Sequence, residues 1–385
     1  MKMTVWIINP FDNLPMEGNR PQRYWLMARA FVGAGHRVVY WTSDFSHAQK
    51  RRRVFVVENP DPAIKVRMVS TRPYPRNICL RRVFSHRALA REWLRLAGAM
   101  SERPDVIVAS TPPLSLCAAA LDFSRRSGAL FVADIMDAWP ETFYRVAPAF
   151  LFAPLRATAR RIYHSADAIS AVAARYLDLA ASYGATSPTH LAYHGIDLQP
   201  SNVQPFNLST FKPFHLAYLG AMSTSYDLET AIDAVAAMPN VSLDLAGSGP
   251  KEEALRTRAA SCQRIRFHGF LGDVDLRALL AKCDVGLVPM FPDSCVGVPY
   301  KLADYAAAGL RVAECLGGET ESLVARHHAG LHYEAGNVES LKGCLTSLMA
   351  PPDPAYDPAA FAAEFDATRI MDGYVAWVQG LCAAK

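Results

Sequence analysis

The stretches VWIIN (5–9), PQRYWLMARAFV (21–32) and RVVYWT (37–42) decide the fold class of this chain. Two short apolar runs flank a segment with helical period, and glycines at 33 and 35 separate that segment from the second run. Apolar runs of this length that alternate with amphipathic helices are typical of β-α-β units. We therefore predict an α/β fold in which helices cover both faces of a parallel sheet.

The same alternation continues on both sides of one interruption. Before it come DVIVAS (105–110), GALFVAD (128–134), AISAV (168–172) and HLAYHG (190–195); after it come FHLAYLG (214–220), VSLDLAG (241–247), RIRFHG (264–269) and DVGLVPM (284–290). The interruption, residues 198–213, contains three prolines and no apolar period, which is typical of a surface linker.

Three segments follow from this pattern. We predict a Rossmann-like first domain over residues 1–200, a Rossmann-like second domain over 201–360, and a C-terminal helix over 361–385 that crosses back to the first domain. A chain of 385 residues is long enough for two cores. Two doubly wound domains are expected to face a central cleft at the carboxyl ends of their strands, where open α/β sheets bind ligands.

The composition is that of a folded, water-soluble chain, with 51% hydrophobic and 20% charged residues. The apolar run near the start stops at Asn9-Pro10, which is too early for a secretory signal, and no run reaches the roughly 18 apolar residues of a membrane span. The eight cysteines form no C-x-x-C pair and no group with histidines at metal spacing. We expect reduced thiols, no bound metal and a cytoplasmic location.

The segment GVPYKLADYAAAG (297–309) carries the chemistry. Pro299 suits the first position of a helix over 299–308, and Gly309 suits its exit. The amino end of such a helix attracts an anion such as a diphosphate. Lys301 and Asp304 lie three apart on one face, so the ammonium can meet phosphate while the carboxylate accepts hydrogen bonds from two ribose hydroxyls. The alternative is an ordinary surface ion pair.

These motifs resemble the retaining GT-B glycosyltransferases of family 4. The resemblance rests on PYKLADYAAAGLRVA (299–313), GNRPQRYWLMARAFVGAGHRVVYWT (18–42), AYLGAMSTSYDLETAIDAV (217–235), DLAGSGP (244–250), FHGFLG (267–272) and YHGIDL (193–198). It implies two Rossmann-like domains, a nucleotide-sugar donor (UDP- or GDP-sugar) bound by the second domain, a saccharide acceptor, and transfer with retention. It also implies no cofactor beyond this co-substrate and no metal. The departing phosphate would take the acceptor proton, so no nucleophile-base pair is required.

The resemblance implies roles for individual residues of this chain, position by position. Asp137, in DIMDAWPE, is expected to face the transferred sugar and Lys301 the phosphates or donor hydroxyls as catalytic groups. The expected donor-binding residues are Gly18, Asn19, Arg23, Ser223, Thr224, Gly249, Phe270, Val298, Pro299, Tyr300 and Asp304. For Gly18 the alternative is an ordinary loop glycine, and for Asp134 and Asp137 it is a cap on the next helix.

Two departures from the family pattern concern the donor site. The family commonly has two glutamates eight positions apart; Val296 and Asp304 stand at these positions, and a valine cannot hydrogen-bond a sugar. The loop 221–227, which often carries two cations in the family, carries none here. The diphosphate charge would then be met by Lys301, the helix amino end, Ser223 and Thr224, and Arg20 or Arg23.

Positive charge is concentrated in the first domain, although the net charge of the chain is only +4. Residues 45–95 contain thirteen Lys and Arg against three Asp and Glu. Arg87, Arg91 and Arg95 recur at helical spacing beside Trp93, a pattern typical of helices on anionic membranes. We expect peripheral attachment to the inner leaflet and a lipid-linked acceptor of surface polysaccharide or glycolipid synthesis. A solvated basic face and a site for an acidic glycan are the alternatives; no nucleic-acid-binding module is present.

Two other functions fit the same architecture. One is a non-catalytic nucleotide-binding scaffold, which the Val296 and loop 221–227 departures favour. The other is a sugar-nucleotide epimerase. Neither the nucleotide base, the donor sugar nor the acceptor follows from the residues.

Overall fold

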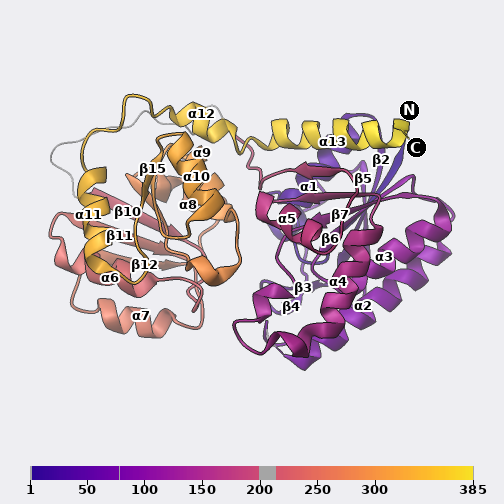
Figure 1. The fold of residues 1–385 in the computed structure, drawn as a ribbon, viewed down its shortest axis with the longest axis horizontal. Helices are drawn as coiled ribbons and strands as arrows, with labels where there is room; N and C mark the ends of the chain where they lie inside the picture. The colour runs from indigo at the N-terminus through magenta and orange to yellow at the C-terminus, as the bar shows by residue number, and fades with distance from the viewer. Residues whose placement is uncertain (1, 78, 199–213, 385) are drawn as a thin grey trace. The chain divides into compact units, whose positions relative to one another are not determined.

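The computed structural model describes residues 2–77, 79–198 and 214–384. The chain divides into two compact units, Met1–Gly195 with Thr368–Lys385 and Ile196–Ala367, which we call the first and second domains. Both are α/β, as predicted, and both contain a wholly parallel sheet (Figure 1). Most of the predicted linker, and with it the predicted boundary at residue 200, lies outside the described residues.

The first domain is built on a seven-stranded parallel sheet in the order β5-β2-β1-β6-β7-β8-β9. These strands are β5 (Ile64–Val69), β2 (Arg37–Ser43), β1 (Thr4–Ile8), β6 (Val106–Thr111), β7 (Leu130–Ile135), β8 (Ala168–Ala171) and β9 (Thr189–Leu191). Strands β1, β6, β7 and β8 are buried along their whole length, as expected where helices cover both faces. A short antiparallel ribbon, β3 (Phe45–Ser46) with β4 (Arg51–Arg52), follows β2.

The helices of the first domain are α1 (Arg23–Gly33), α2 (Leu80–Ala99), α3 (Leu114–Ser127), α4 (Ala153–Ser165), α5 (Ala174–Ser182) and α13 (Ala367–Ala384), with the 3-10 turns η1 (Pro15–Glu17), η2 (Glu141–Phe143) and η3 (Ala149–Phe152). The C-terminal helix α13 belongs here: Tyr374 Oη lies 3.0 Å from Ser170 Oγ, and Gln379 Nε2 lies 3.0 Å from His36 Nε2. The segment predicted as one helix over 361–385 also contains the end of α12, which belongs to the second domain.

The second domain has a six-stranded parallel sheet in the order β12-β11-β10-β13-β14-β15. Its strands are β12 (Ile265–Gly269), β11 (Val241–Ala246), β10 (Phe214–Leu219), β13 (Val285–Val288), β14 (Arg311–Glu314) and β15 (Gly330–His332). Its helices are α6 (Leu228–Ala237), α7 (Glu252–Ala259), α8 (Asp273–Leu280), α9 (Tyr300–Ala307), α10 (Gly318–Arg326), α11 (Val338–Leu348) and α12 (Pro358–Ala363), with the 3-10 turn η4 (Pro292–Ser294).

In each sheet the strand order reverses once, between β1 and β6 in the first domain and between β10 and β13 in the second. Loops that leave neighbouring strands at such a point run in opposite directions, which opens a crevice outside the carboxyl ends of the strands. The two places at which to look for a ligand site are therefore the carboxyl edges beside β1 and beside β10. None of the helices among the described residues is long and apolar enough to cross a membrane.

Candidate active site

The loops that follow β10 and β13 lie against each other at the reversal point of the second domain. The Asp227 amide donates to the Pro289 carbonyl at 2.7 Å, and the Phe291 amide donates to the Ser225 carbonyl at 3.2 Å. Tyr226 and Met290 form an antiparallel bridge between the same loops. These bonds fix the loop 221–227 beside the segment that leads into α9.

Tyr305 holds α9 against the sheet at this point. Its hydroxyl lies 3.2 and 3.0 Å from the carbonyl oxygens of Ala217 and Leu287, and it accepts the Leu219 amide at 3.1 Å. Gly286 leaves room for the ring, because a Cβ at this position would lie 2.2 Å from it. The helix in GVPYKLADYAAAG is thereby seated across β10 and β13, with its small residues Ala306 and Ala307 buried.

Lys301 is the most unusual group in this part of the structure. Its side chain is buried, and its Nζ has no hydrogen-bond partner in the part of the chain that the structure describes. The nitrogen lies 4.1 Å from the ring centroid of Tyr218 and 4.1 Å from that of Tyr226, two cation–π contacts. Burial lowers the pKa of Lys301 well below its ordinary value. The alternative prediction of a surface Lys301–Asp304 ion pair is wrong, because both residues are buried and no acidic side chain among the described residues pairs with Lys301.

Gly220 creates the space that Lys301 occupies. Its φ is +131°, and a Cβ there would lie 3.3 Å from the Lys301 Nζ. A positive φ of this kind favours glycine, so the position is restricted both by conformation and by the neighbouring ammonium. The lysine nitrogen thus sits directly beside the backbone at the carboxyl end of β10.

The amino end of α9 carries no side-chain cap. Pro299 occupies the cap position, with φ −76° and ψ 144°, so the helix begins at Tyr300, one residue later than predicted. The Thr320 hydroxyl donates to the Gly297 carbonyl at 2.7 Å, which ties the start of α10 to the segment before α9. The uncapped amino end of α9 therefore lies at Lys301, and the uncapped amino end of α10 is tied to the segment before α9. The first amides of a helix have no acceptor within it.

The glycines of GSG (247–249) are explained by contact between loops. A Cβ on Gly247 would lie 1.9 Å from the Gly220 carbonyl oxygen, and one on Gly249 would lie 2.4 Å from the Met222 carbonyl oxygen. The Met222 amide also donates to the Ser248 carbonyl at 2.9 Å. The close neighbour that Gly249 accommodates is thus the protein backbone, while a contact of Gly249 with a donor stays a prediction.

Other predicted donor residues lie at the same edge of the sheet. Ser223 and Thr224 are in the loop after β10, where Ser223 is half-buried and Thr224 is exposed, and Phe270 follows β12 with 79% of its surface exposed. Val298 is 3% exposed and Asp304 6%. Val296 lies in the loop that leads to α9, with its amide 3.4 Å from Ser294 Oγ. Their contacts with a donor stay predictions.

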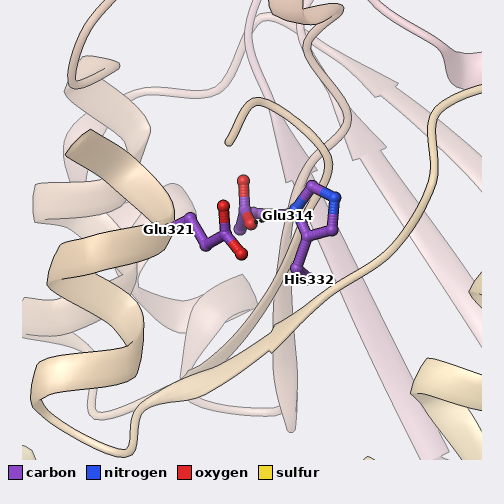
Figure 2. A group of neighbouring side chains, drawn as sticks. All are labelled: Glu314, Glu321 and His332. Carbon is purple, nitrogen blue, oxygen red and sulfur yellow. Dashed lines mark hydrogen bonds and ion pairs between the residues drawn. The ribbon is translucent and has the colours of Figure 1, made fainter. Parts of the chain in front are cut away.

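Glu314, Glu321 and His332 gather at the carboxyl ends of β14 and β15 (Figure 2). The Glu314 carboxylate is fully buried; it accepts the Gly317 amide at 2.8 Å and lies 2.6 Å from His332 Nδ1. Because Gly317 is the cap residue of α10, Glu314 fixes the turn that starts this helix.

In the first domain, the glycine loop after β1 is held by a buried arginine. Arg53 contacts the Glu17 carboxylate, and its guanidinium donates to the carbonyl oxygens of Pro10 and Asp12 at 3.2 and 2.8 Å. Gly18 ends η1 with φ +76°, which accounts for glycine there by conformation alone. Arg53 belongs to the basic cluster QKRRR (49–53), so one of its charges stabilises this loop instead of facing solvent.

Arg23 is buried in the core of the first domain, which contradicts its predicted contact with a donor. The residue is 1% exposed; its Nε and one Nη donate to the two Asp134 oxygens, each at 2.9 Å. Tyr24 and Ser170 also donate to Asp134, each at 2.6 Å. Burial opposes the ionised form, but Arg23 and these hydroxyls together hold the pKa of Asp134 below its ordinary value. The pair joins α1, β7 and β8 in the core.

Asp137 lies two residues beyond β7, where its Oδ2 accepts the Trp139 indole N–H at 3.1 Å. Burial raises its pKa. The alternative of a helix cap is excluded for η2, whose cap residue is Pro140 and which has no side-chain cap. The central carbon of the Arg82 guanidinium lies over the Trp139 ring, 4.7 Å from its centroid. Sequence reasoning missed Arg82, which lies outside the i,i+4 stripe of arginines on the same helix.

The predicted membrane face of α2 is partly wrong. Arg87, Arg91 and Arg95 are exposed, and Leu80 and Phe84 continue the same face toward the start of the helix. Trp93 lies on the opposite side and is fully buried; its ring centroid is 6.5 Å from that of Trp6 and 5.5 Å from that of Phe123. Arg95 is also engaged, in an exposed pair with Glu92 at 2.6 Å. Trp93 therefore belongs to the core and cannot meet a membrane.

Comparisons with known proteins cover most of the chain. Residues 23–200 match a family model described as Glycosyltransferase Family 4, and residues 213–350 match one described as Glycosyl transferases group 1. No curated protein is similar enough in sequence to match. Among solved structures, sucrose-phosphate synthase from Thermosynechococcus elongatus is 16% identical with a TM-score of 0.77, over 100% of both chains.

Two further solved structures have the same fold. Anabaena HepE in complex with UDP is 15% identical with a TM-score of 0.65, over 99% of this chain and 100% of that one. The lipopolysaccharide outer core galactosyltransferase WaaB is 15% identical with a TM-score of 0.66, over 98% and 100%. At these identities the likeness shows the architecture, and the two family models add the sequence signature. The chain belongs to the GT-B glycosyltransferases of the family 4 and group 1 type.

Proposed function

We propose that this protein transfers a sugar from a nucleotide-sugar donor to a saccharide acceptor, with retention of configuration and without a metal. The observation that carries the proposal is Lys301, a buried lysine at the point where the second sheet reverses its strand order, with no hydrogen-bond partner in residues 2–77, 79–198 and 214–384. Burying a charged lysine without a partner costs free energy unless an anion pairs with it. The diphosphate of a sugar nucleotide is such an anion.

The donor would lie along the carboxyl edge of the second sheet. The uncapped start of α9 would face the diphosphate beside Lys301, with the hydroxyls of Ser223 and Thr224 as further donors. Asp304 would accept hydrogen bonds from the ribose hydroxyls, and the exposed ring of Phe270 would cover the base. HepE has been solved with UDP and with UDP-glucose, which favours a UDP-sugar over a GDP-sugar as the first donor to test.

The reaction needs no enzyme nucleophile in this scheme. The acceptor hydroxyl oxygen forms a bond to the anomeric carbon while the bond from that carbon to the diphosphate oxygen breaks, and the hydroxyl proton passes to the departing phosphate. Lys301 in its charged form, together with the helix amides, would stabilise the negative charge that grows on the diphosphate. Asp137 would orient the transferred sugar.

The exposed face of α2 suits a peripheral membrane site. Leu80 and Phe84 are 78% and 58% exposed, and Arg87, Arg91 and Arg95 follow on the same face. Apolar side chains beside a row of arginines match the interface of an anionic leaflet. A lipid-linked saccharide of surface polysaccharide or glycolipid synthesis would then be the acceptor, at the inner leaflet of the plasma membrane.

The test is a screen of UDP-, GDP- and ADP-sugars for thermal stabilisation, followed by product analysis with the donor that binds. A glycosyltransferase releases the nucleoside diphosphate in proportion to acceptor. An epimerase converts or hydrolyses the donor with no acceptor present, and a scaffold binds without turnover. Failure of every nucleotide and sugar nucleotide to stabilise the wild-type protein would overturn the donor assignment.

A further inference from the structure

Arg82 is a partly buried cation without a carboxylate partner. Its Nη1 donates to the Asn77 carbonyl at 2.7 Å, and its Nε lies 3.4 Å from His86 Nε2. No ion pair joins Arg82 to an acidic side chain within the described ranges 2–77, 79–198 and 214–384. Burial lowers its pKa below the ordinary value, in spite of the nearby Tyr74, Asp137 and Cys79. Most of the five N–H donors of the guanidinium therefore make no hydrogen bond to a charged group.

Aromatic rings surround this guanidinium. Its central carbon lies 4.7 Å from the ring centroid of Trp139, 5.7 Å from that of Phe11 and 5.8 Å from that of Tyr74. The His86 ring is tilted against Trp139 at 5.9 Å and against Phe11 at 5.6 Å. A planar guanidinium packed among rings at these distances loses less freedom on binding a second fork-shaped group than a flexible lysine would.

A second cation lies at the same cluster. The Lys50 Nζ donates to the His47 carbonyl, lies 3.3 Å from His47 Nδ1, and stands 5.4 Å from the Tyr74 ring centroid. Burial and the charge of Arg82 lower the pKa of Lys50 to about 8. No acidic side chain among the described residues pairs with Lys50. An anion placed between Lys50 and Arg82 would relieve the repulsion that each exerts on the other.

The remaining polar groups of the cluster add no negative charge apart from Asp137. Burial and the charge of Arg82 lower the pKa values of His47 and His86 to about 3, so both rings are neutral at neutral pH. Burial raises the pKa of Tyr74 to about 12. The titratable and charged groups that face the cluster are Arg82, Lys50, His47, His86, Tyr74, Cys79 and Asp137, and two cations outnumber the single carboxylate.

The cluster lies where the first sheet should bind its ligand. Phe11 follows β1, Trp139 follows β7, and both strands present their carboxyl ends at the edge beside the β1–β6 reversal. Asp137, proposed above to orient the transferred sugar, is hydrogen-bonded to the Trp139 ring on which Arg82 stacks. The Trp139 side chain thus contacts both Arg82 and Asp137, so a group bound by Arg82 would lie near the carboxylate proposed to orient the sugar.

We propose that Arg82 and Lys50, framed by Phe11, Tyr74 and Trp139, form a phosphate-binding site in the first domain that holds a phosphate of the acceptor. The inference rests on the proposed function in one respect, that the chain has an acceptor; binding of phosphate itself does not depend on it. A guanidinium fork matches phosphate with two parallel hydrogen bonds, and the aromatic frame suits the sugar that the phosphate carries. The phosphate can belong to a soluble sugar phosphate or to a lipid-linked diphosphate sugar.

The experiment titrates the full-length protein with inorganic pyrophosphate in the presence of saturating UDP, which occupies the proposed donor site. Calorimetry gives the affinity, and the ring ¹⁵N signals of His47 and His86 report where the anion binds. Arg82→Gln and Lys50→Gln are each expected to weaken pyrophosphate binding about tenfold or more, as for the loss of one charge-assisted hydrogen bond. Arg81→Gln is the matched control, because Arg81 is exposed on the same turn and outside the cluster.

Two outcomes would overturn the proposal: pyrophosphate that leaves both histidine signals unmoved, or equal affinity in Arg82→Gln and Arg81→Gln. Lys301→Met should abolish the UDP response while the histidine signals still respond to pyrophosphate, which separates this site from the donor site. A third arm compares glucose 1-phosphate with a short prenyl diphosphate. Tighter binding of the sugar phosphate supports the site with a soluble acceptor, and tighter binding of the prenyl diphosphate supports it with a lipid-linked one.

Discussion

The side-chain nitrogen of Lys301 lies 4.1 Å from the centre of the Tyr218 ring, and no described residue accepts a hydrogen bond from it. Burial disfavours the charged form of this lysine and places its pKa well below the ordinary value. A bound diphosphate would supply the missing negative charge and raise the pKa again. Under the proposed function, Lys301 would thus couple proton uptake to binding of the donor.

We expect UDP binding to take up as much as one proton at a pH between the lowered pKa of free Lys301 and its higher pKa in the complex. The sign follows because the complex favours the charged lysine, so affinity falls as the pH rises through this window. Calorimetric titration in buffers of different ionisation enthalpy measures the uptake. Lys301→Met removes the titrating group and keeps the length of the side chain. Equal proton uptake in that variant would contradict the assignment to Lys301.

We expect Asp304→Ala to abolish turnover and to weaken UDP binding about tenfold or more, because a carboxylate that accepts ribose hydroxyls is lost. Asp304→Glu, which places the common family residue at this position, should keep measurable binding. The circular dichroism spectrum of both variants should match the wild type. Calorimetry decides the point: wild-type UDP affinity in Asp304→Ala would falsify the ribose assignment.

We expect Arg23→Met to destabilise the first domain by about 3–5 kcal/mol, because it leaves the Asp134 carboxylate buried without its cation. All six tryptophans (Trp6, Trp25, Trp41, Trp93, Trp139 and Trp377) lie in the first domain, so urea unfolding followed by tryptophan fluorescence reports on this domain alone. Arg81→Met serves as the control for an exposed arginine and should change the unfolding free energy by less than about 0.5 kcal/mol.

The same pair predicts a dependence on acid. The pKa of Asp134 is lowered in the folded chain, so its contribution to stability is present above the unfolded pKa and is lost as the pH falls through the folded one. Wild-type stability should therefore fall more steeply with acid than that of an Arg23→Met/Asp134→Leu double variant. Parallel acid profiles for the two proteins would show that the pair does not carry this dependence.

We expect Leu80→Ser/Phe84→Ser to reduce binding to anionic vesicles, because these exposed apolar side chains would enter the interface, and Arg87→Gln/Arg91→Gln to make the remaining binding insensitive to salt. Co-sedimentation with vesicles of phosphatidylcholine, with and without phosphatidylglycerol, measures both effects. Trp93→Phe is the control and should bind as the wild type does, since Trp93 is buried in the core. Equal sedimentation of all variants would remove α2 from the membrane proposal.

Periodicity along the chain determined the fold class. Runs such as VWIIN and VSLDLAG are apolar throughout because helices cover both faces of a parallel sheet, so they are visible without a structure. The edge strand β5 was not predicted, since its alternating burial over IKVRMV leaves charged residues at every second position. Strands β14 and β15 were also not predicted, because RVAE and GLH are too short to show a period.

The sequence also located the helix at 299–308 and the small residues that let it approach the sheet, because prolines and glycines mark helix ends by their own backbone preferences. It did not determine how charges are used. By residue type, Arg23 was expected to bind a ligand and Trp93 to contact a membrane, yet both lie in the core. Only the packing of α1 and α2 against the sheet decides which face of each helix is buried. Within the described residues Lys301 lacks a hydrogen-bond partner and Arg82 lacks a carboxylate partner, and both facts follow from tertiary structure, because whether a charge has a partner depends on residues far away in the chain.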